Sequence, residues 1–509
     1  MKRILIERNR YFDSVFLMRI SHELEQLPNV GKVVVAMGTP ANLENLEKAG
    51  FVITGESSEA IHPNDLVIAI EGESDDAIEG ANEHLQLLLT GPTLGEGAAA
   101  GVPRPMTLSE AIRTDPDANL ALISVPGAYA AREARQALRQ GLHVMLFSDN
   151  VSVEDEIALK DEAIDRGLLM MGPDCGTAIL NGAPLGFANV VRRGPIGIVG
   201  ASGTGIQEIT SLTHRLGGGI SHAIGSGGRD LSSNVGARMS LFAIEALVAD
   251  PKTDVIVVVS KTPAAAVAEK VVEALTATGK PGIVQFVGGG KREAEGDVAF
   301  AETLADAAEL ACTAAGIQPV VSTDAEPAHD LAGFAGRVHG LYCGGTLCQE
   351  AWSLMQRAGI DVRSNVAGDP ETKAHPEMEV SGNVLWDLGD DAFTIGKPHP
   401  MIEPSLRDDE VVRCAEDNAV GVILVDCVLG YGAHPDPAGS LADAAKRAIE
   451  AARQDGRNLL IIASVTGTDD DPQNRSRQVA ALTEAGVLVA PSNAAAARWA
   501  VEAMNGGVG

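Results

Sequence analysis

Residues 197–208 read Gly-Ile-Val-Gly-Ala-Ser-Gly-Thr-Gly-Ile-Gln-Glu, and residues 339–350 read His-Gly-Leu-Tyr-Cys-Gly-Gly-Thr-Leu-Cys-Gln-Glu. The two stretches align without a gap, so that residues 202–204 (Ser-Gly-Thr) fall on residues 344–346 (Gly-Gly-Thr). In each copy an apolar strand runs into small residues, and a helical pattern follows. Small residues let a ligand approach backbone N–H groups, and a helix N-terminus adds a partial positive charge. The repeat predicts a phosphate or carboxylate site between two similar domains.

The duplication continues beyond the Gly-rich stretches. Each copy is followed by a polar loop, an apolar strand, a helix and a second strand. Alternating strands and helices of this kind indicate parallel α/β layers. In such folds ligands bind at the carboxyl ends of the strands, where both Gly-rich loops lie. The predicted segments are strands 254–259, 282–287, 421–426 and 458–463, with helices near 263–278 and 440–454.

Composition narrows the class of protein. With 509 residues, 45% of them apolar, the chain is globular and long enough for three or four domains. Its formal net charge of −30 argues against a nucleic-acid or anionic-membrane binder, because phosphate backbones need a basic face. A small anionic substrate remains compatible with this charge, since a site can be locally positive.

The cysteines and the N-terminus indicate a cytoplasmic protein. Six cysteines in this length do not form a disulfide framework, and the spacing of Cys343 and Cys348 is not a usual zinc spacing. We therefore expect buried free thiols and no metal. The first residues are charged almost at once, which is not typical of a signal peptide, and no run approaches the length of a membrane span.

The chain divides into four predicted domains. The N-terminal unit reads as strand 3–7, helix 14–27, strand 31–36, helix 41–49, strand 66–71 and helix 74–90. Each later domain alternates strands and helices in the same way. The predicted boundaries are 1–90 for a small α/β unit, 91–107 for a linker, 108–190 for a second α/β domain, 191–316 and 335–509 for the two related domains, and 317–334 for a second linker.

Residues 118–295 resemble the α-subunit of succinyl-CoA synthetase. The matching motifs are Gly-Pro-Asp-Cys at 172–175, Ser-Gly-Thr at 202–204, Gly-Gly-Arg-Asp at 227–230 and Gly-Lys-Arg at 290–292. Residues 337–500 resemble the carboxyl-terminal ligase domain of the β-subunit of that enzyme. With the small unit in front, the arrangement resembles the FdrA family of acyl-CoA-synthetase-like proteins. The resemblance implies a Rossmann-like CoA-binding-type domain at 108–190, followed by two flavodoxin-like ligase domains.

Two departures from the succinyl-CoA synthetase pattern concern its chemistry. That family carries its phosphoryl group on a histidine shortly after the Gly-Lys-Arg turn, where this chain has Glu295 and no histidine between His222 and His329. A solvated Glu295 is the expected alternative to a phosphorylated one. The family's orienting glutamate after strand 254–259 is replaced by Lys261. The nucleotide-binding region of the β-subunit is also missing, so the chain alone is not expected to be a nucleotide-dependent ligase.

The FdrA resemblance implies a carbamoyltransferase subunit in allantoin and purine degradation, converting oxalurate and phosphate to oxamate and carbamoyl phosphate. Its ligands would be small anions (phosphate, carbamoyl phosphate and oxamate), and separate partner subunits or a homo-oligomer would complete it. CoA remains a candidate cofactor, with a vestigial site as the alternative. Two other functions stay open: an acyl-CoA ligase or CoA transferase with a replaced phosphoryl carrier, and a non-catalytic anion-binding scaffold.

Candidate site residues follow from these motifs. His399 and His434 lie in His-Pro loops of the second ligase domain, where each either serves the reaction or shapes its loop. A side chain at Gly345 is expected to displace phosphate with little effect on folding, and Asp426 is a candidate orienter. The candidate catalytic residues are His434, His399 and Lys261; the phosphate- and substrate-binding candidates are Ser202, Gly203, Thr204, Gly227, Gly228, Lys291, Arg292, Gly344, Gly345 and Thr346; the CoA-like site comprises Pro126, Gly172, Pro173 and Cys175, with Cys175 more typical of a packed turn than of a nucleophile.

Overall fold

The structure is a computed structural model that describes residues 1–10, 12, 14–39, 42–43, 46–47, 50–51, 61–90, 105–290, 292–327, 331, 334, 336–378, 381–394 and 398–506. The helix predicted over 41–49 and the linker predicted over 91–107 lie largely outside these residues. The chain divides into two compact units. The first comprises Met1–Thr107 and Asp391–His399, and the second comprises Leu108–Asp390 and Pro400–Gly509.

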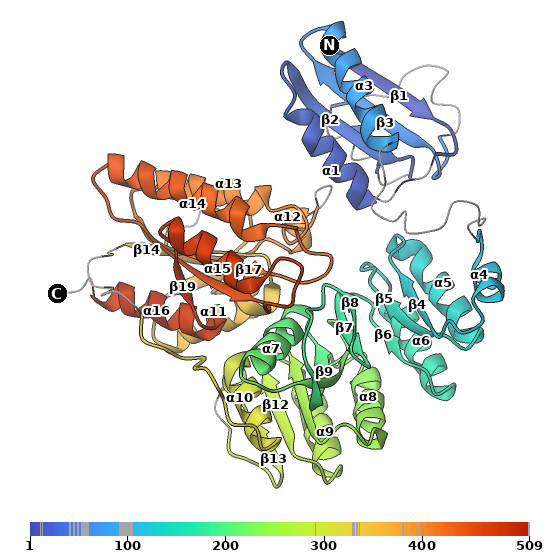
Figure 1. The fold of residues 1–509 in the computed structure, drawn as a ribbon, viewed down its shortest axis with the longest axis vertical. Helices are drawn as coiled ribbons and strands as arrows, with labels where there is room; N and C mark the ends of the chain where they lie inside the picture. The colour runs from blue at the N-terminus through green and yellow to red at the C-terminus, as the bar shows by residue number, and fades with distance from the viewer. Residues whose placement is uncertain are drawn as a thin grey trace. The chain divides into compact units, whose positions relative to one another are not determined.

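The first unit contains a three-stranded antiparallel sheet in the order β1-β3-β2. A parallel sheet was predicted here and is wrong for this unit. Strands β1 and β2 are connected through a helix as in a parallel sheet, but β3 inserts between them and pairs antiparallel with both. Leu17, Leu24, Ile68 and Leu85 form part of its core. The elements are β1 (Lys2–Glu7), α1 (Ser14–Glu25), β2 (Val30–Met37), β3 (Leu66–Gly72) and α3 (Asp75–Thr90) (Figure 1).

The second unit begins with a small three-stranded parallel sheet in the order β4-β5-β6. The hairpin that follows, β7 (Thr177–Leu180) and β8 (Ala183–Gly186), joins the next sheet through pairing of β7 with β10. The predicted domain 108–190 therefore contributes strands to its neighbour. Its other elements are α4 (Leu108–Thr114), β4 (Leu120–Ile123), α5 (Gly127–Arg139), β5 (His143–Leu146), α6 (Val153–Asp165) and β6 (Met170–Met171).

The first ligase-like domain has the sheet order β13-β12-β11-β9-β10, extended by the β7–β8 hairpin. Strands β9 to β13 are parallel. Its elements are β9 (Arg193–Ala201), α7 (Gly203–Arg215), β10 (Ile220–Gly225), α8 (Arg238–Ala249), β11 (Val255–Ser260), α9 (Ala265–Thr276), β12 (Gly282–Phe286), β13 (Val298–Phe300) and α10 (Leu304–Ala314).

The second ligase-like domain has the parallel sheet order β15-β16-β14-β17-β18-β19. The short helix α12 (Asp391–Thr394) belongs to the first compact unit. The elements are β14 (Arg337–Tyr342), α11 (Gly345–Arg357), β15 (Val362–Ser364), β16 (Asn383–Asp387), α13 (Ser405–Glu416), β17 (Val420–Val428), α14 (Pro437–Gln454), β18 (Leu460–Thr466), α15 (Arg475–Glu484), β19 (Leu488–Ala490) and α16 (Asn493–Gly506).

The two ligase-like domains share one topology. Strands β10-β9-β11-β12-β13 and β16-β14-β17-β18-β19 both follow the flavodoxin order 2-1-3-4-5. The α/β class is confirmed, and these two domains have the predicted flavodoxin-like topology. The first domain has helices on both faces of its sheet, because α7 and α10 pack in one hydrophobic cluster and α8 and α9 in another.

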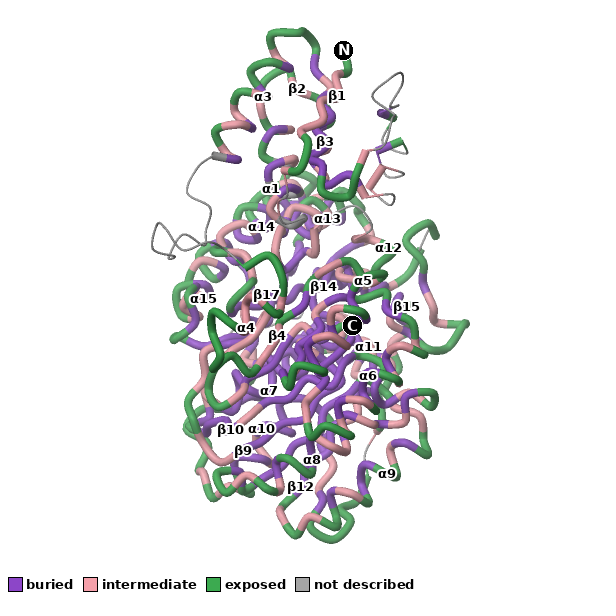
Figure 2. Tube along the Cα trace, turned by 90° about the vertical axis from the view of Figure 1, so that its right-hand side faces the viewer, coloured by how far each residue is buried: buried purple, intermediate pink, exposed green. Residues whose placement is uncertain are grey.

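One hydrophobic core spans both ligase-like domains. It contains buried residues of α7, α10, α11 and α16 together with residues of both sheets, such as Ile206, Ala307, Leu347 and Ala496. Figure 2 shows buried segments around α7, α10 and α11. The two domains are therefore packed as halves of one core. Burial of this apolar area is the main stabilising contribution to their association.

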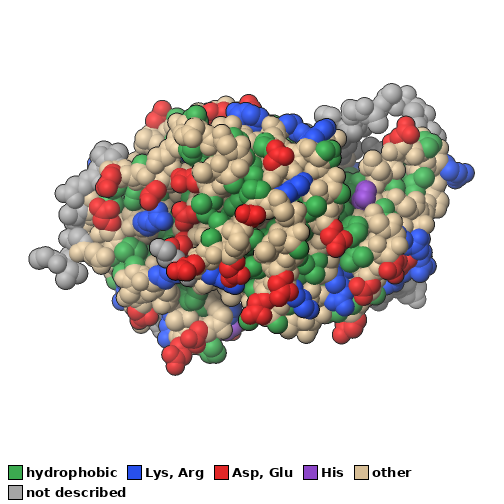
Figure 3. All heavy atoms as spheres, turned by 90° about the horizontal axis from the view of Figure 1, so that it is seen from below, with side chains coloured by type: hydrophobic (Ala, Val, Ile, Leu, Met, Phe, Trp, Pro, Cys, Tyr) green, Lys and Arg blue, Asp and Glu red, His purple; other side chains and the backbone are tan. Residues whose placement is uncertain are grey.

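Surface charge is mixed. On the face drawn in Figure 3, acidic and basic side chains are interspersed, although acidic residues outnumber basic ones by 69 to 39 over the whole sequence. All six cysteines are buried, and none forms a disulfide. Of the helices that the structure describes, none combines the length and apolarity needed to cross a membrane.

Candidate functional site

The two Gly-rich loops meet at the carboxyl ends of β9 and β14. Ser202 Oγ and Thr346 Oγ1 are 2.6 Å apart and hydrogen-bonded. A Cβ atom on Gly344 would lie 2.9 Å from the Thr204 methyl group, so only glycine allows this approach. The first loop follows β9, which lies beside β11, and the second follows β14, which lies beside β17. Each of these places is the topological switch point of its sheet, where doubly wound folds bind ligands.

Reciprocal contacts hold the two loops in register. Glu350, on α11 of the second domain, accepts hydrogen bonds from Leu304 N at the start of α10 (2.6 Å) and from Asn493 Nδ2 (2.8 Å). Glu208, on α7 of the first domain, accepts from Asn493 N at the start of α16 (3.2 Å) and from the Thr466 hydroxyl. Each glutamate thus caps the last helix of the other domain, where a carboxylate complements the helix dipole. This exchange explains the glutamate that ends each repeat copy.

Two backbone donors of the second loop, those of Cys343 and Gly344, are already occupied. The Asp426 carboxylate, fully buried on β17, accepts hydrogen bonds from Cys343 N and Gly344 N, each at 2.7 Å. Arg407, also buried, donates to the Asp426 carbonyl at 3.1 Å. The sequence predicted Asp426 as an orienter and Gly344 as a phosphate ligand. The structure instead gives the Gly344 N–H an internal anion, so that prediction for Gly344 is wrong.

In the first loop the two N–H groups at the start of α7 are open. Ser202 caps its own helix by accepting from Gly205 N at 3.1 Å. The N–H groups of Gly203 and Thr204 have no acceptor within the part of the chain that the structure describes, and both residues are half-buried. A Cβ on Gly203 would meet only Thr177 Oγ1, at 3.4 Å. The first loop can therefore take an external anion at Gly203 and Thr204. In the second loop Gly344 cannot, although the N–H groups of Gly345 and Thr346 also lack an acceptor among the described residues.

Gly345 faces a carboxylate and an ammonium group. A Cβ here would fall within 3.0 Å of Asp387 Oδ2 and 3.3 Å from Lys261 Nζ. The expectation that Gly345 borders an empty phosphate position, tolerant of a larger side chain, is therefore wrong. Lys261 follows β11 of the first domain and is exposed, while Asp387 ends β16 of the second. Gly344 therefore lies against Thr204 and Asp426, and Gly345 lies against Asp387 and Lys261.

Asp387 is held in place from its backbone. Asn365 Oδ1 accepts from Asp387 N at 2.8 Å, and Asn365 Nδ2 donates to the Asp387 carbonyl at 2.9 Å. Asp387 Oδ1 accepts from Gly389 N at 3.0 Å. Burial raises the pKa of Asp387 to about 6, although the positive charge of Lys261 opposes this shift. Sequence reasoning placed Asp387 in a matching motif but gave it no role. Its position opposite Lys261 on another domain is a tertiary feature.

The loop at 225–230 turns toward the predicted CoA-like turn rather than toward the Gly-rich loops. A Cβ on Gly227, whose φ is +91°, would overlap the Pro173 carbonyl, and one on Gly228 would lie 2.8 Å from Asp174 Oδ2. Gly172, with φ +107°, has the same relation to the Leu146 carbonyl. These glycines serve close packing, and the prediction that Gly227 and Gly228 bind phosphate has no support in their contacts.

Cys175 is not arranged as a nucleophile. Its thiol is buried and lies 3.5 Å from the Gly225 carbonyl and 3.7 Å from the Thr177 carbonyl. Burial raises the pKa of this thiol to about 12. A thiol that stays protonated at neutral pH fits the packed turn.

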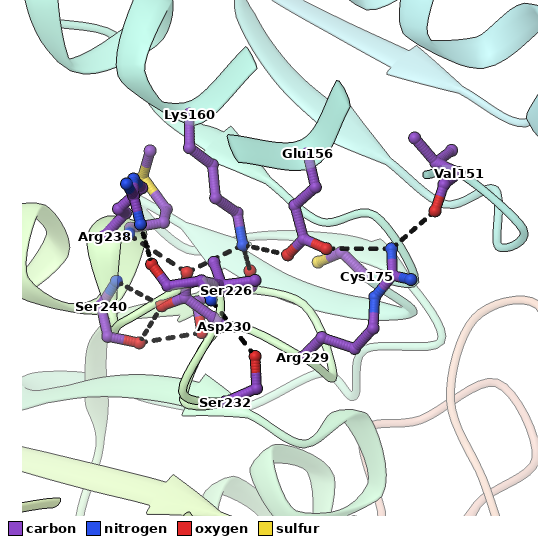
Figure 4. Close-up of polar contacts among 12 residues, drawn as sticks. Val151, Glu156, Lys160, Cys175, Ser226, Arg229, Asp230, Ser232, Arg238 and Ser240 are labelled. Atoms are coloured by element: carbon purple, nitrogen blue, oxygen red, sulfur yellow. Dashed lines mark hydrogen bonds and ion pairs between the residues drawn. The ribbon is translucent and has the colours of Figure 1, made fainter. Parts of the chain in front are cut away.

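A buried ion cluster joins the three-stranded domain to the first ligase-like domain (Figure 4). Lys160 on α6 is fully buried and donates to Glu156 (2.6 Å), Asp230 (2.8 Å) and the Ser226 carbonyl (3.0 Å). Arg229 lies 2.9 Å from the other Glu156 oxygen. The sequence signal for this cluster was the Glu156–Lys160 spacing of four residues on one helix. Its partner loop could not be read from sequence.

The histidine candidates are not brought together with the loops by any observed contact. His434 is half-buried, and its Nδ1 accepts from Asp436 N at 3.1 Å, which supports the loop-shaping alternative. His399 belongs to the first compact unit. Burial lowers the pKa of His399 to about 4.

The remaining predicted residues lie on surfaces or turns. Lys291 lies outside the described residues. Arg292 is exposed, pairs with Glu295 and stacks over the Phe300 ring at 4.4 Å. This pairing is the solvated arrangement expected as the alternative to a phosphorylated Glu295. Pro126 precedes α5, whose face forms an open cavity of about 440 Å³ lined by Arg132, Arg135, Gln136, Arg139 and Gln140.

Comparison with known proteins places this geometry in a family. Residues 341–503 match the CoA-ligase family model, residues 191–289 the CoA-binding domain model, and residues 1–102 the model described as AllF, heavy metal-associated domain. The chain is 45% identical to the Escherichia coli protein YahF over 506 residues, which is 96% of each chain. The chain belongs to the YahF family. The CoA-binding match of this YahF-family chain falls on the first flavodoxin-like domain.

Other proteins are similar to parts of this YahF-family chain. The Trichomonas vaginalis mitochondrial ADP-forming succinate–CoA ligase subunit alpha-2 is 31% identical over 167 residues, 32% of this chain and 52% of that relative. The solved dinucleotide-forming acetyl-coenzyme A synthetase 1 of Ca. Korarchaeum cryptofilum, in complex with phosphate and ADP, is 16% identical with a TM-score of 0.34, covering 80% of this chain and 86% of that one. A structural likeness of this size carries no argument about activity.

The heavy-metal description of the N-terminal model does not fit the residues of this YahF-family chain. Heavy metals favour soft thiolate ligands, and the first cysteine in the sequence is Cys175. Among the residues that the structure describes, no group of three His, Cys, Asp or Glu side chains could hold a metal ion. We derive no step through a metal.

Proposed function

We propose that this chain is one subunit of a carbamoyltransferase that converts oxalurate and phosphate to oxamate and carbamoyl phosphate in allantoin degradation. The match of residues 1–102 to the AllF model supports the link to allantoin. The observation that carries the proposal is the meeting of the two Gly-rich loops at the switch point. There the N–H groups of Gly203 and Thr204 are open, and Lys261 supplies a cation.

Phosphate is held at the first loop in this proposal. The two open N–H groups and the α7 dipole would form charge-assisted hydrogen bonds with its oxygens. Lys261, from the loop after β11, would offset the added negative charge. The chain has no histidine to carry a phosphoryl group near the Gly-Lys-Arg turn, so transfer proceeds by positioning and charge stabilisation. This absence disfavours an acyl-CoA ligase that works through phosphohistidine.

The direct test is carbamoyl phosphate formation. The full chain is co-expressed with the products of neighbouring genes, and the purified assembly is given oxalurate and phosphate. Carbamoyl phosphate is then trapped by coupling it to ATP synthesis from ADP. We expect turnover by the assembly, little by the chain alone, and no acid-labile label after incubation with labelled ATP. An assembly that consumes no oxalurate, or a histidine that takes up label stoichiometrically, would overturn the proposal.

A matched pair of glycine variants tests the location of phosphate. Gly203→Val places a branched side chain beside the open N–H groups, while Gly382→Val changes an exposed glycine with nothing within 4 Å of its Cβ position. Loss of one charged hydrogen bond weakens phosphate binding by roughly tenfold or more. Calorimetry should find this loss for Gly203→Val alone. Equal phosphate affinity in both folded variants would place the anion elsewhere.

A further inference from the structure

Asp387 and Lys261 come from different domains and converge at the start of α11. Asp387 Oδ2 and Lys261 Nζ both lie against the position that a Gly345 Cβ would occupy. The two side chains differ in exposure. Lys261 is exposed on a loop, whereas Asp387 is 7% exposed and its backbone N–H and carbonyl are both hydrogen-bonded to the Asn365 side chain. The two groups therefore form one composite feature that requires both ligase-like domains.

One oxygen of Asp387 has no hydrogen-bond partner. Oδ1 accepts from Gly389 N, whereas Oδ2 has none among the residues that the structure describes. This oxygen is directed at the N-terminus of α11, where the N–H groups of Gly345 and Thr346 also lack an acceptor among the described residues. Asp387 is a largely buried residue, and an oxygen of its carboxylate that makes no hydrogen bond within the protein is available to a donor on a ligand. The arrangement calls for a ligand with an N–H or O–H donor.

We propose that Asp387 is the proton acceptor of the transfer reaction and that Lys261 holds the carboxylate of the acceptor substrate. This inference rests on the proposed function, and it assigns roles to residues rather than adding another reaction. The ligand class is a small molecule that carries an amide nitrogen next to a carboxylate. Asp387 receives the nitrogen end, and Lys261 receives the carboxylate end.

The step balances in atoms and charge. In the direction of oxalurate formation, the amide nitrogen bonds to the carbamoyl carbon, and the bond from that carbon to the phosphate oxygen breaks with its electron pair on phosphate. The proton leaving the nitrogen passes to Asp387 and then to phosphate or water. In the reverse direction protonated Asp387 returns the proton to the departing nitrogen. General acid–base help of this kind contributes about 10²–10⁴-fold in rate.

The charges around Asp387 are compatible with both protonation states. Lys261 faces it from the loop after β11, Asp390 from the loop after β16, Asp426 from β17 and the Cys348 thiol from α11. Burial raises its pKa to about 6 against the opposing effect of Lys261. A carboxyl group that titrates near this pH can both accept and return a proton at neutral pH.

The test compares two site variants with two exposed controls in the co-expressed assembly. Asp387→Asn keeps an oxygen for Gly389 N and removes the proton acceptor, and Asp443→Asn, on a residue 81% exposed, is its control. We expect Asp387→Asn to lower kcat at least a hundredfold with phosphate affinity within twofold, and to remove the acidic limb near pH 6 from the rate profile. Lys261→Met should raise KM for oxamate about tenfold, while exposed Lys270→Met should not.

The outcomes separate this inference from the proposed function. If the wild-type assembly transfers carbamoyl groups but Asp387→Asn keeps its kcat or its acidic limb, the role of Asp387 is refuted and the function stands. If the wild-type assembly transfers nothing, both fail together. Should Asp387→Asn not fold, the Lys261→Met arm decides alone, and an unchanged oxamate KM contradicts the composite site.

Discussion

Replacing Glu350 with leucine should destabilise the second ligase-like domain in a pH-dependent way. The substitution leaves the Leu304 N–H buried without an acceptor and removes one of the two acceptors of Asn493 Nδ2, which keeps the Leu347 carbonyl. Each unsatisfied buried donor costs about 1–3 kcal/mol. The leucine variant no longer has to bury a carboxylate, and this gain in stability partly offsets the cost. In the wild type Glu350 is 2% exposed, and burial raises its pKa to about 7.

The sign of the pH effect follows from this raised pKa. Between the unfolded value, near 4.5, and about 7, folded Glu350 binds a proton that the unfolded chain has released. Wild-type stability therefore contains a contribution that is full below the unfolded pKa and is lost as pH rises to about 7. From pH 5.5 to pH 8 this loss covers about 1.5 pH units, or about 2 kcal/mol. The leucine variant lacks it, so the substitution should cost about 2 kcal/mol more at pH 5.5 than at pH 8.

Urea unfolding followed by tryptophan fluorescence measures this difference directly. All three tryptophans, Trp352, Trp386 and Trp499, lie in the second ligase-like domain. The control is Glu273→Leu on the exposed face of α9, for which we expect a change within about 0.5 kcal/mol at both pH values. A cost for Glu350→Leu that is the same at both pH values, or no larger than that of the control, would refute the reasoning.

Three further predictions concern packing and thiol chemistry. Gly345→Ala should lower the free energy of unfolding by about 1–3 kcal/mol in urea titrations, because its Cβ would overlap Asp387 Oδ2, whereas Gly382→Ala should not; equal midpoints would contradict this packing. Lys160→Met should cost about 3–5 kcal/mol by leaving buried Asp230 without its cation and Glu156 with Arg229 alone, and a thermal midpoint like that of wild type would show the cluster to be dispensable. Cys175 should resist iodoacetamide at pH 8 in the native state, since its thiol is buried with a pKa of about 12; rapid native-state alkylation would disprove its burial.

The strands of the two ligase-like domains could be located from sequence because the repeat marks them. Apolar runs bounded by Gly-rich turns identified β9, β11, β14 and β17, and alternation with helices gave the parallel layers. The antiparallel sheet of the first unit was not predictable in this way. The insertion of β3 between β1 and β2 depends on which strands pair, and a strand–helix alternation does not reveal pairing.

The site was predictable in its loops but not in its electrostatics. Glycines at 203, 344 and 345 marked close backbone approach, which the structure confirms at the last two. Sequence alone does not show whether a backbone N–H group is open or already bound to a carboxylate. The hydrogen bonds from Cys343 N and Gly344 N to Asp426 were therefore not predicted. The facing of Asp387 and Lys261 likewise depends on two domains packed together.

The exchanged helix caps bear on how such a chain could have arisen. Each ligase-like half supplies a glutamate that completes the other half, and one apolar core runs through both. The covalent connection at 317–334 therefore contributes little to their association, apart from fixing the two halves at a one-to-one stoichiometry. A gene cut at this connection would still yield two polypeptides that assemble as a pair. In evolution, fusion and fission of these halves would be nearly neutral changes, with the exchanged caps fixing the pairing in either form.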